Sequence, residues 1–203
     1  GSPQVRKRVF IVGIRKDFIP KGTELDLRKL PIFEPNAFIK VQIEDETDES
    51  LVLNNQQEAN IRKLMRDSIR RGAKPFGPSF HDGMRRVGKA YSCDGGNVGQ
   101  AYHAYGLVPT LTKVWARFMP VYFPALGEEP PSVHSPVIKV NHLYGSGNLR
   151  KVSVAEAMLL QGFPKSFVSH EKRQLAYQHA GNAVNAKVVR ELASLLLDFI
   201  EKS

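Results

Sequence analysis

The sequence predicts an α/β fold, because it contains both strand-length apolar runs and stretches with the apolar period of helices. Val9–Ile14 is a short apolar run of strand composition, and Val137–Leu143 is a second one. Asn54–Arg71 places apolar residues on one stripe with basic residues off it, and Gly72 is suited to end this helix. Glycines in residues 72–100 and prolines in residues 120–131 predict irregular loops and short pieces between these elements.

The last third of the chain predicts helices, the first of which begins at Ser153. Ser153 is followed three residues later by Glu156, which is the spacing of a capping box. Ala155, Met158 and Leu159 would form the apolar face of this helix. Gly162 can take the left-handed conformation that ends it.

Two more helices are expected after it. The second runs from about His170 to Gln178, after Ser169, and Gly181-Asn182 breaks it and starts the third. The third helix begins near Ala183 and has an apolar stripe that must pack against a sheet or another helix. This stripe contains Val184, Val188, Leu192, Leu195, Leu196 and Phe199.

The composition is that of an ordinary soluble globular protein. At 203 residues, with 42% hydrophobic and 24% charged residues, the chain can hold one domain or one and a half. It has no apolar run of membrane-spanning length, and the charges at Arg6–Arg8 before a short apolar run do not fit a signal peptide. The single cysteine, Cys93, excludes an internal disulfide and suits a reducing cytoplasm. The histidines show no metal-ligand spacing, so we expect no metal site.

The positive charge is concentrated in one region. The chain has a net charge of +9, and residues 60–90 contain nine Lys and Arg residues against two Asp residues. Such a block suits a polyanionic partner, because neutralised phosphates release counterions. The alternative is a solvated basic helix. We favour nucleic acid, with Arg85, Arg86 and Lys89 as candidate DNA-binding residues.

The N-terminal segment gathers polar side chains on one face. In an extended chain Gln4, Arg6 and Arg8 project together, because residues two apart share a face. Two guanidinium groups on one face need a carboxylate, a phosphate or a carbonyl-rich ligand if they are buried. The alternative is a positively charged entrance to a strand.

Several motifs together resemble those of the DNA (cytosine-5) methyltransferases. Arg-Lys-Val-Ser-x-x-Glu-Ala-x-x-Leu-Gln-Gly-Phe-Pro at Arg150–Pro164, followed by Tyr-Gln-x-x-Gly-Asn-Ala-Val at Tyr177–Val184, resembles the last two signature motifs of that family. Pro-Gln-x-Arg-x-Arg at Pro3–Arg8 resembles the signature that supplies arginines to the flipped cytosine. Thr110-Leu111 resembles the Thr-Leu pair of the target-recognition region, although a strand start with an exposed threonine is an equal alternative.

The resemblance implies a role for each of these residues. Arg8 would contact the extruded cytosine, Arg6 would brace it, and Gln4 would order the loop, because the methylated base must leave the duplex. Thr110, next to Leu111, would hold a phosphate near the extruded nucleotide. Asn182 and Ala183 would border the cofactor S-adenosylmethionine at a helix N-terminus.

The resemblance also implies a fold and its division. The chain would be the C-terminal part of a doubly wound S-adenosylmethionine-dependent methyltransferase domain with an irregular, β-rich target-recognition domain. Residues 1–20 would form the last strand region of the catalytic domain, 21–148 the target-recognition domain, and 149–203 a helical return to the catalytic domain.

Three family motifs are missing: the Phe-x-Gly-x-Gly cofactor loop, the Pro-Cys nucleophile and the Glu-Asn-Val acid. Cys93 lies in Ser-Cys-Asp, without the preceding proline. We therefore expect the chain to be inactive alone and to need double-stranded DNA and an N-terminal catalytic half, fused or separate. A prokaryotic or phage restriction–modification system is the expected source. The alternatives are a non-catalytic DNA-binding derivative and an RNA methyltransferase of the same fold.

Overall fold

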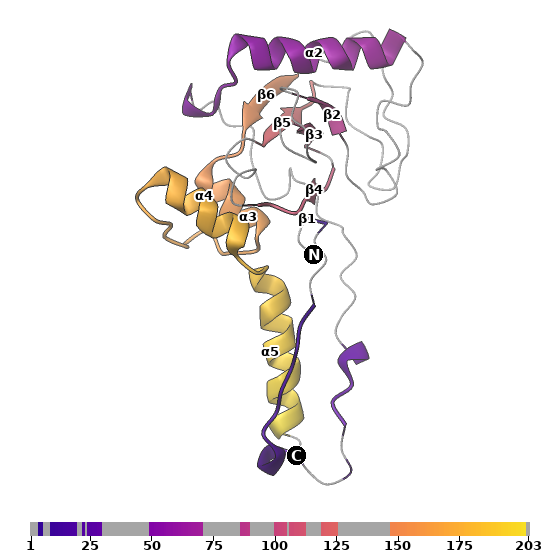
Figure 1. Ribbon diagram of the computed structural model, residues 1–203, viewed down its shortest axis with the longest axis vertical. Coiled ribbons are helices and arrows are strands. Elements are labelled where there is room, and N and C mark those ends of the chain that lie inside the picture. Colours follow the sequence, from indigo (N-terminus) through magenta and orange to yellow (C-terminus); the bar gives the residue numbers. More distant parts are fainter. Residues whose placement is uncertain are drawn as a thin grey trace.

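The structure, a computed structural model, describes part of the chain and shows a mixed α/β fold (Figure 1). This confirms the predicted class. The described residues are 4–5, 9–19, 22, 24–29, 49–70, 86–89, 100–104, 106–112, 119–125 and 147–201. Several predicted features lie outside them: the strand Val137–Leu143, Arg6, Arg8, Arg85 and Cys93.

The described strands form two small sheets. The four-stranded sheet has the order β2-β3-β5-β6, from Arg86–Lys89, Gln100–His103, Pro120–Phe123 and Asn148–Lys151. Its central pair, β3 and β5, is parallel, and the two outer pairs are antiparallel. A second sheet pairs β1 (Gln4–Val5) in parallel with β4 (Val108–Pro109).

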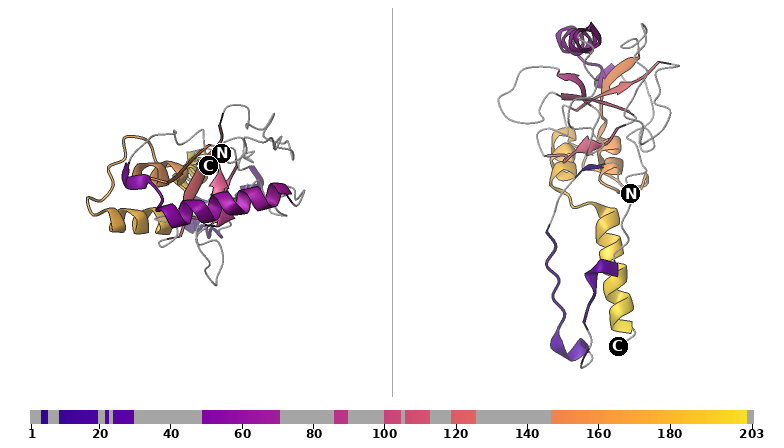
Figure 2. Two further views of the ribbon diagram at one scale, coloured as in Figure 1. Left: turned by 90° about the horizontal axis from the view of Figure 1, so that it is seen from above. Right: turned by 90° about the vertical axis from the view of Figure 1, so that its right-hand side faces the viewer.

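The predicted helix in Asn54–Arg71 is confirmed as α2 (Asn55–Arg70), which lies across the four-stranded sheet (Figures 1 and 2). The Oδ1 atom of Asn54 accepts a hydrogen bond from the Gln57 N–H at 2.8 Å, which caps the helix start. Arg62 donates to the main-chain oxygen of Gly147 at 3.0 Å, so α2 is tied to the turn before β6. The described residues also include the short 3-10 helices η1 (Lys16–Phe18), η2 (Leu27–Lys29) and η3 (Glu49–Leu51).

The capping box predicted at Ser153 is confirmed at the start of α3 (Val154–Leu160). The Glu156 N–H donates to Ser153 Oγ at 3.1 Å, and the Ser153 N–H donates to Glu156 Oε2 at 2.7 Å. Gly162 has a φ of 82° and ends the helix as predicted. The predicted apolar face is only partly right, because Met158 is buried but Ala155 is exposed. Ala157 and Leu160 are buried in its place.

The predicted break at Gly181-Asn182 is wrong. α4 (Arg173–Asn182) includes both residues, and α5 (Ala186–Glu201) begins four residues later. A glycine costs a helix only about 1 kcal/mol, which packing can offset, and Gly181 is buried. Asn185 starts α5, because its Oδ1 accepts hydrogen bonds from the Lys187 and Val188 N–H groups. The expected start near Ser169 is also displaced, since α4 begins at Arg173.

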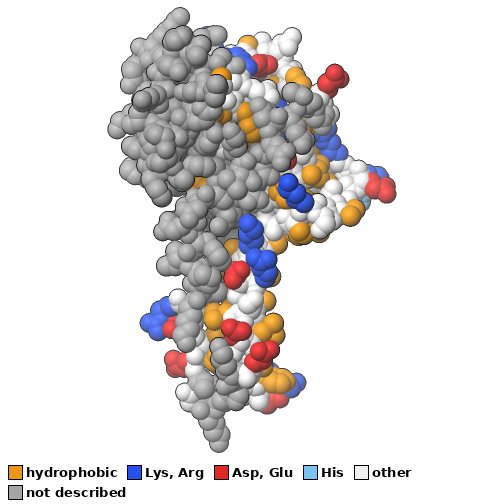
Figure 3. Space-filling model, turned by 180° about the vertical axis from the view of Figure 1, so that it is seen from behind, with side chains coloured by type: hydrophobic (Ala, Val, Ile, Leu, Met, Phe, Trp, Pro, Cys, Tyr) orange, Lys and Arg blue, Asp and Glu red, His pale blue; other side chains and the backbone are white. Residues whose placement is uncertain are grey.

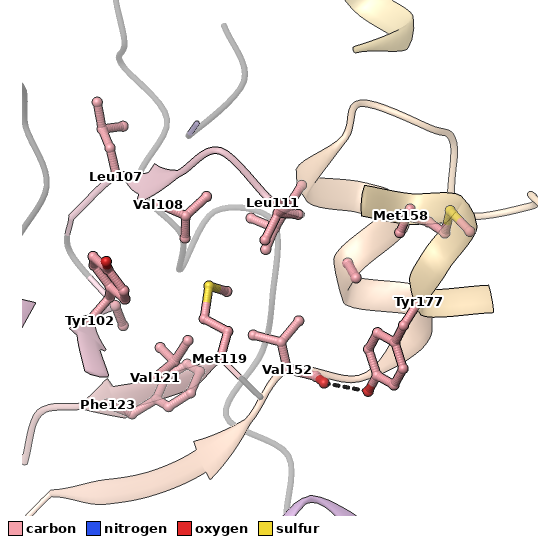
Figure 4. Packing of buried hydrophobic residues seen from close by; sticks show 14 residues of the cluster. Tyr102, Leu107, Val108, Leu111, Met119, Val121, Phe123, Val152, Met158 and Tyr177 are labelled. Atoms are coloured by element: carbon pink, nitrogen blue, oxygen red, sulfur yellow. Dashed lines mark hydrogen bonds between the residues drawn. The ribbon is translucent and has the colours of Figure 1, made fainter. Parts of the chain in front are cut away.

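The core joins the strands to α3 and α4 (Figure 4). Tyr122 and Phe123 of β5 are buried in it. The Tyr177 hydroxyl donates to the Val152 main-chain oxygen at 2.6 Å (Figure 4). The cluster comprises Tyr102, Ala104, Leu107, Val108, Leu111, Met119, Val121, Phe123, Val152, Ala157, Met158, Leu160, Tyr177 and Ala180.

Two apolar segments lie outside this core cluster. α5 projects away from the sheets and the other α-helices, none of its residues is buried, and hydrophobic side chains are visible along it (Figures 1 and 3). Val9–Ile14 does not form the predicted strand, and Val9 and Ile11 are 89% and 95% exposed. A segment that is apolar on both faces becomes a strand only between other strands and covering layers. The described residues do not supply that environment.

Candidate nucleic-acid and cofactor site

The pairing of β1 with β4 brings two predicted site segments together. Gln4 pairs with Val108, and Val5 pairs with Pro109, in parallel register. β4 is followed directly by Thr110, and β1 leads into the segment that contains Arg6 and Arg8. Gln4 and Val5, which precede Arg6 in the sequence, therefore lie beside the main chain that leads into Thr110.

The two residues of the Thr-Leu pair have different surroundings. Leu111 is fully buried in the core, so its side chain does not reach the surface. Thr110 is half-buried. A contact of this pair with a phosphate therefore rests on Thr110, whose hydroxyl can both donate and accept hydrogen bonds.

The Thr110 segment is fixed to the C-terminal helices through the core. Val108 and Leu111 belong to the same buried cluster as Met158 of α3 and Ala180 of α4 (Figure 4). Ala180 lies two residues before Asn182. The core thus connects the segment that leads into Thr110 to the helix that ends at Asn182.

A buried ion pair fixes β6 to α3. Arg150 donates to Glu156 through two bonds, Nη1 to Oε2 at 2.9 Å and Nη2 to Oε1 at 2.7 Å. The same guanidinium lies 4.8 Å from the centre of the Phe123 ring. Because Glu156 also accepts the Ser153 N–H, one carboxylate serves both the helix cap and the ion pair.

The proposed cofactor-binding residues lie where α4 ends. Asn182 is exposed as the last residue of α4, and Ala183 is half-buried and donates its N–H to the His179 main-chain oxygen at 2.9 Å. They lie at a helix C-terminus, and the N-terminus of α5 begins after Asn185, which corrects their expected position. An exposed amide can donate to and accept from the hydroxyl and carboxylate groups of S-adenosylmethionine. These residues fit one edge of such a site.

The candidate DNA-binding residues Arg86 and Lys89 lie in β2, the edge strand of the four-stranded sheet. Their partners in β3 are Tyr102 and Gln100, and the register shifts between Arg86 and Gly88. An edge strand leaves one side of its backbone open to a partner. Arg85 precedes this strand but lies outside the described residues.

The described residues offer neither a metal cluster nor a membrane-spanning helix. They contain no group of three or more His, Cys, Asp or Glu side chains that could hold a metal ion. None of the helices described is long and apolar enough to cross a membrane.

Comparison with known proteins identifies the family. A family model described as C-5 cytosine-specific DNA methylase matches residues 1–197. The chain belongs to this family. The predicted resemblance to DNA (cytosine-5) methyltransferases is thereby confirmed, together with the enzyme class of the family.

Three proteins that are similar to this chain are longer than it is. It is 38% identical over 56 residues to the type II methyltransferase M1.ScrFI of Lactococcus lactis subsp. cremoris, which covers 28% of this chain and 14% of that protein. The solved methyltransferase EhMeth of Entamoeba histolytica has a TM-score of 0.46 and 16% identity, covering 88% of this chain and 45% of that one. A DNMT2 mutant of Spodoptera frugiperda has a TM-score of 0.43 and 15% identity, covering 79% and 42%. The chain thus spans less than half of each solved protein.

Three polar residues hold α3, α4 and α5 in place, and the sequence alone predicts no structural role for them. Tyr177 bonds the main chain of Val152, Asn185 caps α5, and Gln161 is fully buried behind α3. Tyr177 and Gln161 belong to the two motifs at Arg150–Pro164 and Tyr177–Val184. A sequence motif does not show which atoms a side chain contacts. Gln161 is a polar residue on the apolar side of the end of a helix, and this position indicates a buried side chain that needs a hydrogen-bond partner.

Proposed function

We propose that this chain is the C-terminal part of a DNA (cytosine-5) methyltransferase of a restriction–modification system. It recognises a specific site in double-stranded DNA and completes the pocket for a flipped cytosine, which is methylated from S-adenosylmethionine. Residues 1–20 and 149–203 belong to the catalytic domain, and residues 21–148 form the target-recognition domain.

The observation that carries this proposal is the pairing of β1 with β4. It places Gln4 and Val5, which precede Arg6 in the sequence, beside the segment that leads into Thr110, and Val108 and Leu111 connect that segment to α3 and α4. One site can therefore receive a base-contacting arginine, a phosphate-contacting threonine and the Asn182 turn. These three segments are far apart in the sequence.

Each residue has a chemical task in this site. A guanidinium at Arg8 donates to the O2 atom of the extruded cytosine and stabilises negative charge as it builds on the ring. Arg6 braces Arg8, Gln4 orders the loop, and Thr110 holds a phosphate of the backbone. Asn182 and Ala183 border S-adenosylmethionine, which supplies the methyl group when bound. The nucleophilic thiolate comes from a polypeptide segment outside this chain.

The two apolar segments that lie outside the core support the need for an N-terminal catalytic half. Val9–Ile14 is apolar on both faces, as in a central strand of a covered sheet. α5 has an apolar stripe, and none of its residues is buried. A sheet supplied by the N-terminal half would pair with the first segment and pack against the second.

The test is methyl transfer from tritiated S-adenosylmethionine to double-stranded DNA. We expect no incorporation by the chain alone and incorporation when it is mixed with the half that carries Pro-Cys and the glycine-rich loop. Methylation by the chain alone, or none by the mixture, would overturn the proposal. DNA binding without methylation by the mixture would favour the non-catalytic DNA-binding alternative.

A further inference from the structure

One buried residue, Gln161, holds both ends of the segment that joins α4 to α5. Gln161 directly follows α3 and is fully buried. Its side-chain Nε2 donates a 2.7 Å hydrogen bond to the main-chain oxygen of Ala180, in the last turn of α4. Its main-chain oxygen accepts a 2.9 Å hydrogen bond from the N–H of Ala186, the first residue of α5. The segment between these two contacts contains Asn182 and Ala183.

Gly162 brings the same stretch of main chain close to the start of α5. A Cβ atom at Gly162 would lie 3.0 Å from Asn185 Oδ1 and 3.2 Å from the Lys187 nitrogen. Gly162 also has a φ of 82°, which side chains rarely tolerate. Gln161 and Gly162 therefore fix the position at which the connecting segment enters α5.

Packing alone does not account for an amide at position 161. In the part of the chain that the structure describes, the Gln161 Oε1 atom is buried without a hydrogen-bond partner. Burying an unpaired acceptor is unfavourable, and a methionine or leucine would fill a similar volume without this cost. The Nε2 bond to Ala180 is the contact that only the amide provides.

We propose that Gln161 is a positioning residue for the Asn182–Ala183 edge of the cofactor site. It sets the conformation of the segment between Ala180 and Ala186 from both of its ends, and thereby places the Asn182 amide. The role toward S-adenosylmethionine rests on the proposed function, whereas the control of the segment does not.

The first experiment measures amide hydrogen exchange in the full chain. Gln161→Met keeps the apolar volume and removes the Nε2 bond, so we expect the Ala183 and Ala186 amides to exchange about tenfold faster. Gln161→Leu, which has no donor either, should do the same. The matched control is Tyr177→Phe, which loses another buried bond from α4 to a main-chain oxygen and should leave both amides unchanged. Unchanged exchange in both Gln161 variants would overturn the proposal.

The second experiment measures the Kd of S-adenosylmethionine by calorimetry in the complex with the N-terminal half. Displacing a positioned group raises the Kd in Gln161→Met by about 10- to 100-fold, whereas Tyr177→Phe stays near the wild-type value. A wild-type complex that binds no S-adenosylmethionine would refute the proposed function, and the exchange result would still decide the structural role of Gln161. A wild-type complex that binds it, with an equal Kd in Gln161→Met, would refute the positioning role.

Discussion

Gln4 pairs with Val108 across the parallel strands β1 and β4, so residues near the start of the sequence lie beside residues from its middle. A parallel bridge between distant segments closes a long loop, and loop closure has an entropic cost that other contacts must offset. The core residues Val108 and Leu111, next to this bridge, supply such contacts with α3 and α4. The proposed pocket therefore depends on the β1–β4 pairing, in which β4 is fixed to the core through Val108.

Arg8→Ala tests the proposed contact with the base. In the complex with the N-terminal half, we expect a loss in kcat of about 100- to 1,000-fold, because a donor to the developing charge is removed. Arg8→Lys should recover only part of it, because an ammonium lacks the planar fork. Arg15→Ala is the control, since Arg15 is exposed and pairs with Asp17. A kcat of Arg8→Ala near that of Arg15→Ala would contradict the assignment.

The basic residues around β2 are tested by the salt dependence of DNA binding. Replacing Arg85, Arg86 and Lys89 together by alanine should weaken binding to all sequences alike. The slope of log K against log salt should become shallower by about 0.9 for each phosphate that the variant no longer neutralises. Fluorescence anisotropy over a salt series measures this. The control is Lys165→Ala, which replaces an exposed lysine after α3. If the triple variant has the same salt slope as Lys165→Ala, these three residues do not contact DNA.

The Arg150–Glu156 pair should contribute strongly to stability because it is buried. The two side chains are only 3% and 11% exposed, so removing the charge of one partner leaves the charge of the other buried and unpaired. We expect Glu156→Gln to lower the free energy of unfolding by about 3–5 kcal/mol, measured by urea denaturation. Asp17→Asn breaks the exposed pair with Arg15 and should cost about 0–1 kcal/mol. Equal effects of the two variants would show that the buried pair has no special role.

Gly147 should tolerate no side chain. A Cβ atom there would come within 2.9 Å of the Ala125 nitrogen and would collide with the Phe123 main-chain oxygen. Because both neighbours are backbone, Gly147→Ala should destabilise the chain by about 2–4 kcal/mol. Gly13→Ala is the matched control, with nothing within 4 Å of its Cβ position. Thermal denaturation compares the two variants. If Gly147→Ala is as stable as Gly13→Ala, the backbone of Phe123 and Ala125 does not approach position 147 this closely.

The sequence was sufficient where structure depends on neighbouring residues. The capping box at Ser153, the left-handed Gly162 and the helix α2 all follow from side chains within a few positions of each other. The motif letters were also sufficient to indicate the family.

The sequence was insufficient where contacts between distant segments determine the structure. The end of α4 lies beyond Gly181, and the start of α5 is held by Gln161, which no periodicity reveals. Val9–Ile14 has the composition of a strand, but a strand needs a partner, and the described residues offer none. The β1–β4 bridge has no local signature, so the proximity of Gln4 to the Thr110 segment was not foreseen.

The distance between positions 8 and 182 decides whether the arginine segment and the Asn182 turn share one pocket. Cys93 is the only cysteine, so a Cys93→Ser chain with Arg8→Cys and Asn182→Cys can be spin-labelled at these two sites alone. Pulsed electron paramagnetic resonance then gives their separation in the complex with the N-terminal half and DNA. We expect a single distance within about 20 Å, the span of a pocket around one nucleotide and two labels. A distance of about 40 Å or more, larger than any such pocket, would contradict a shared site.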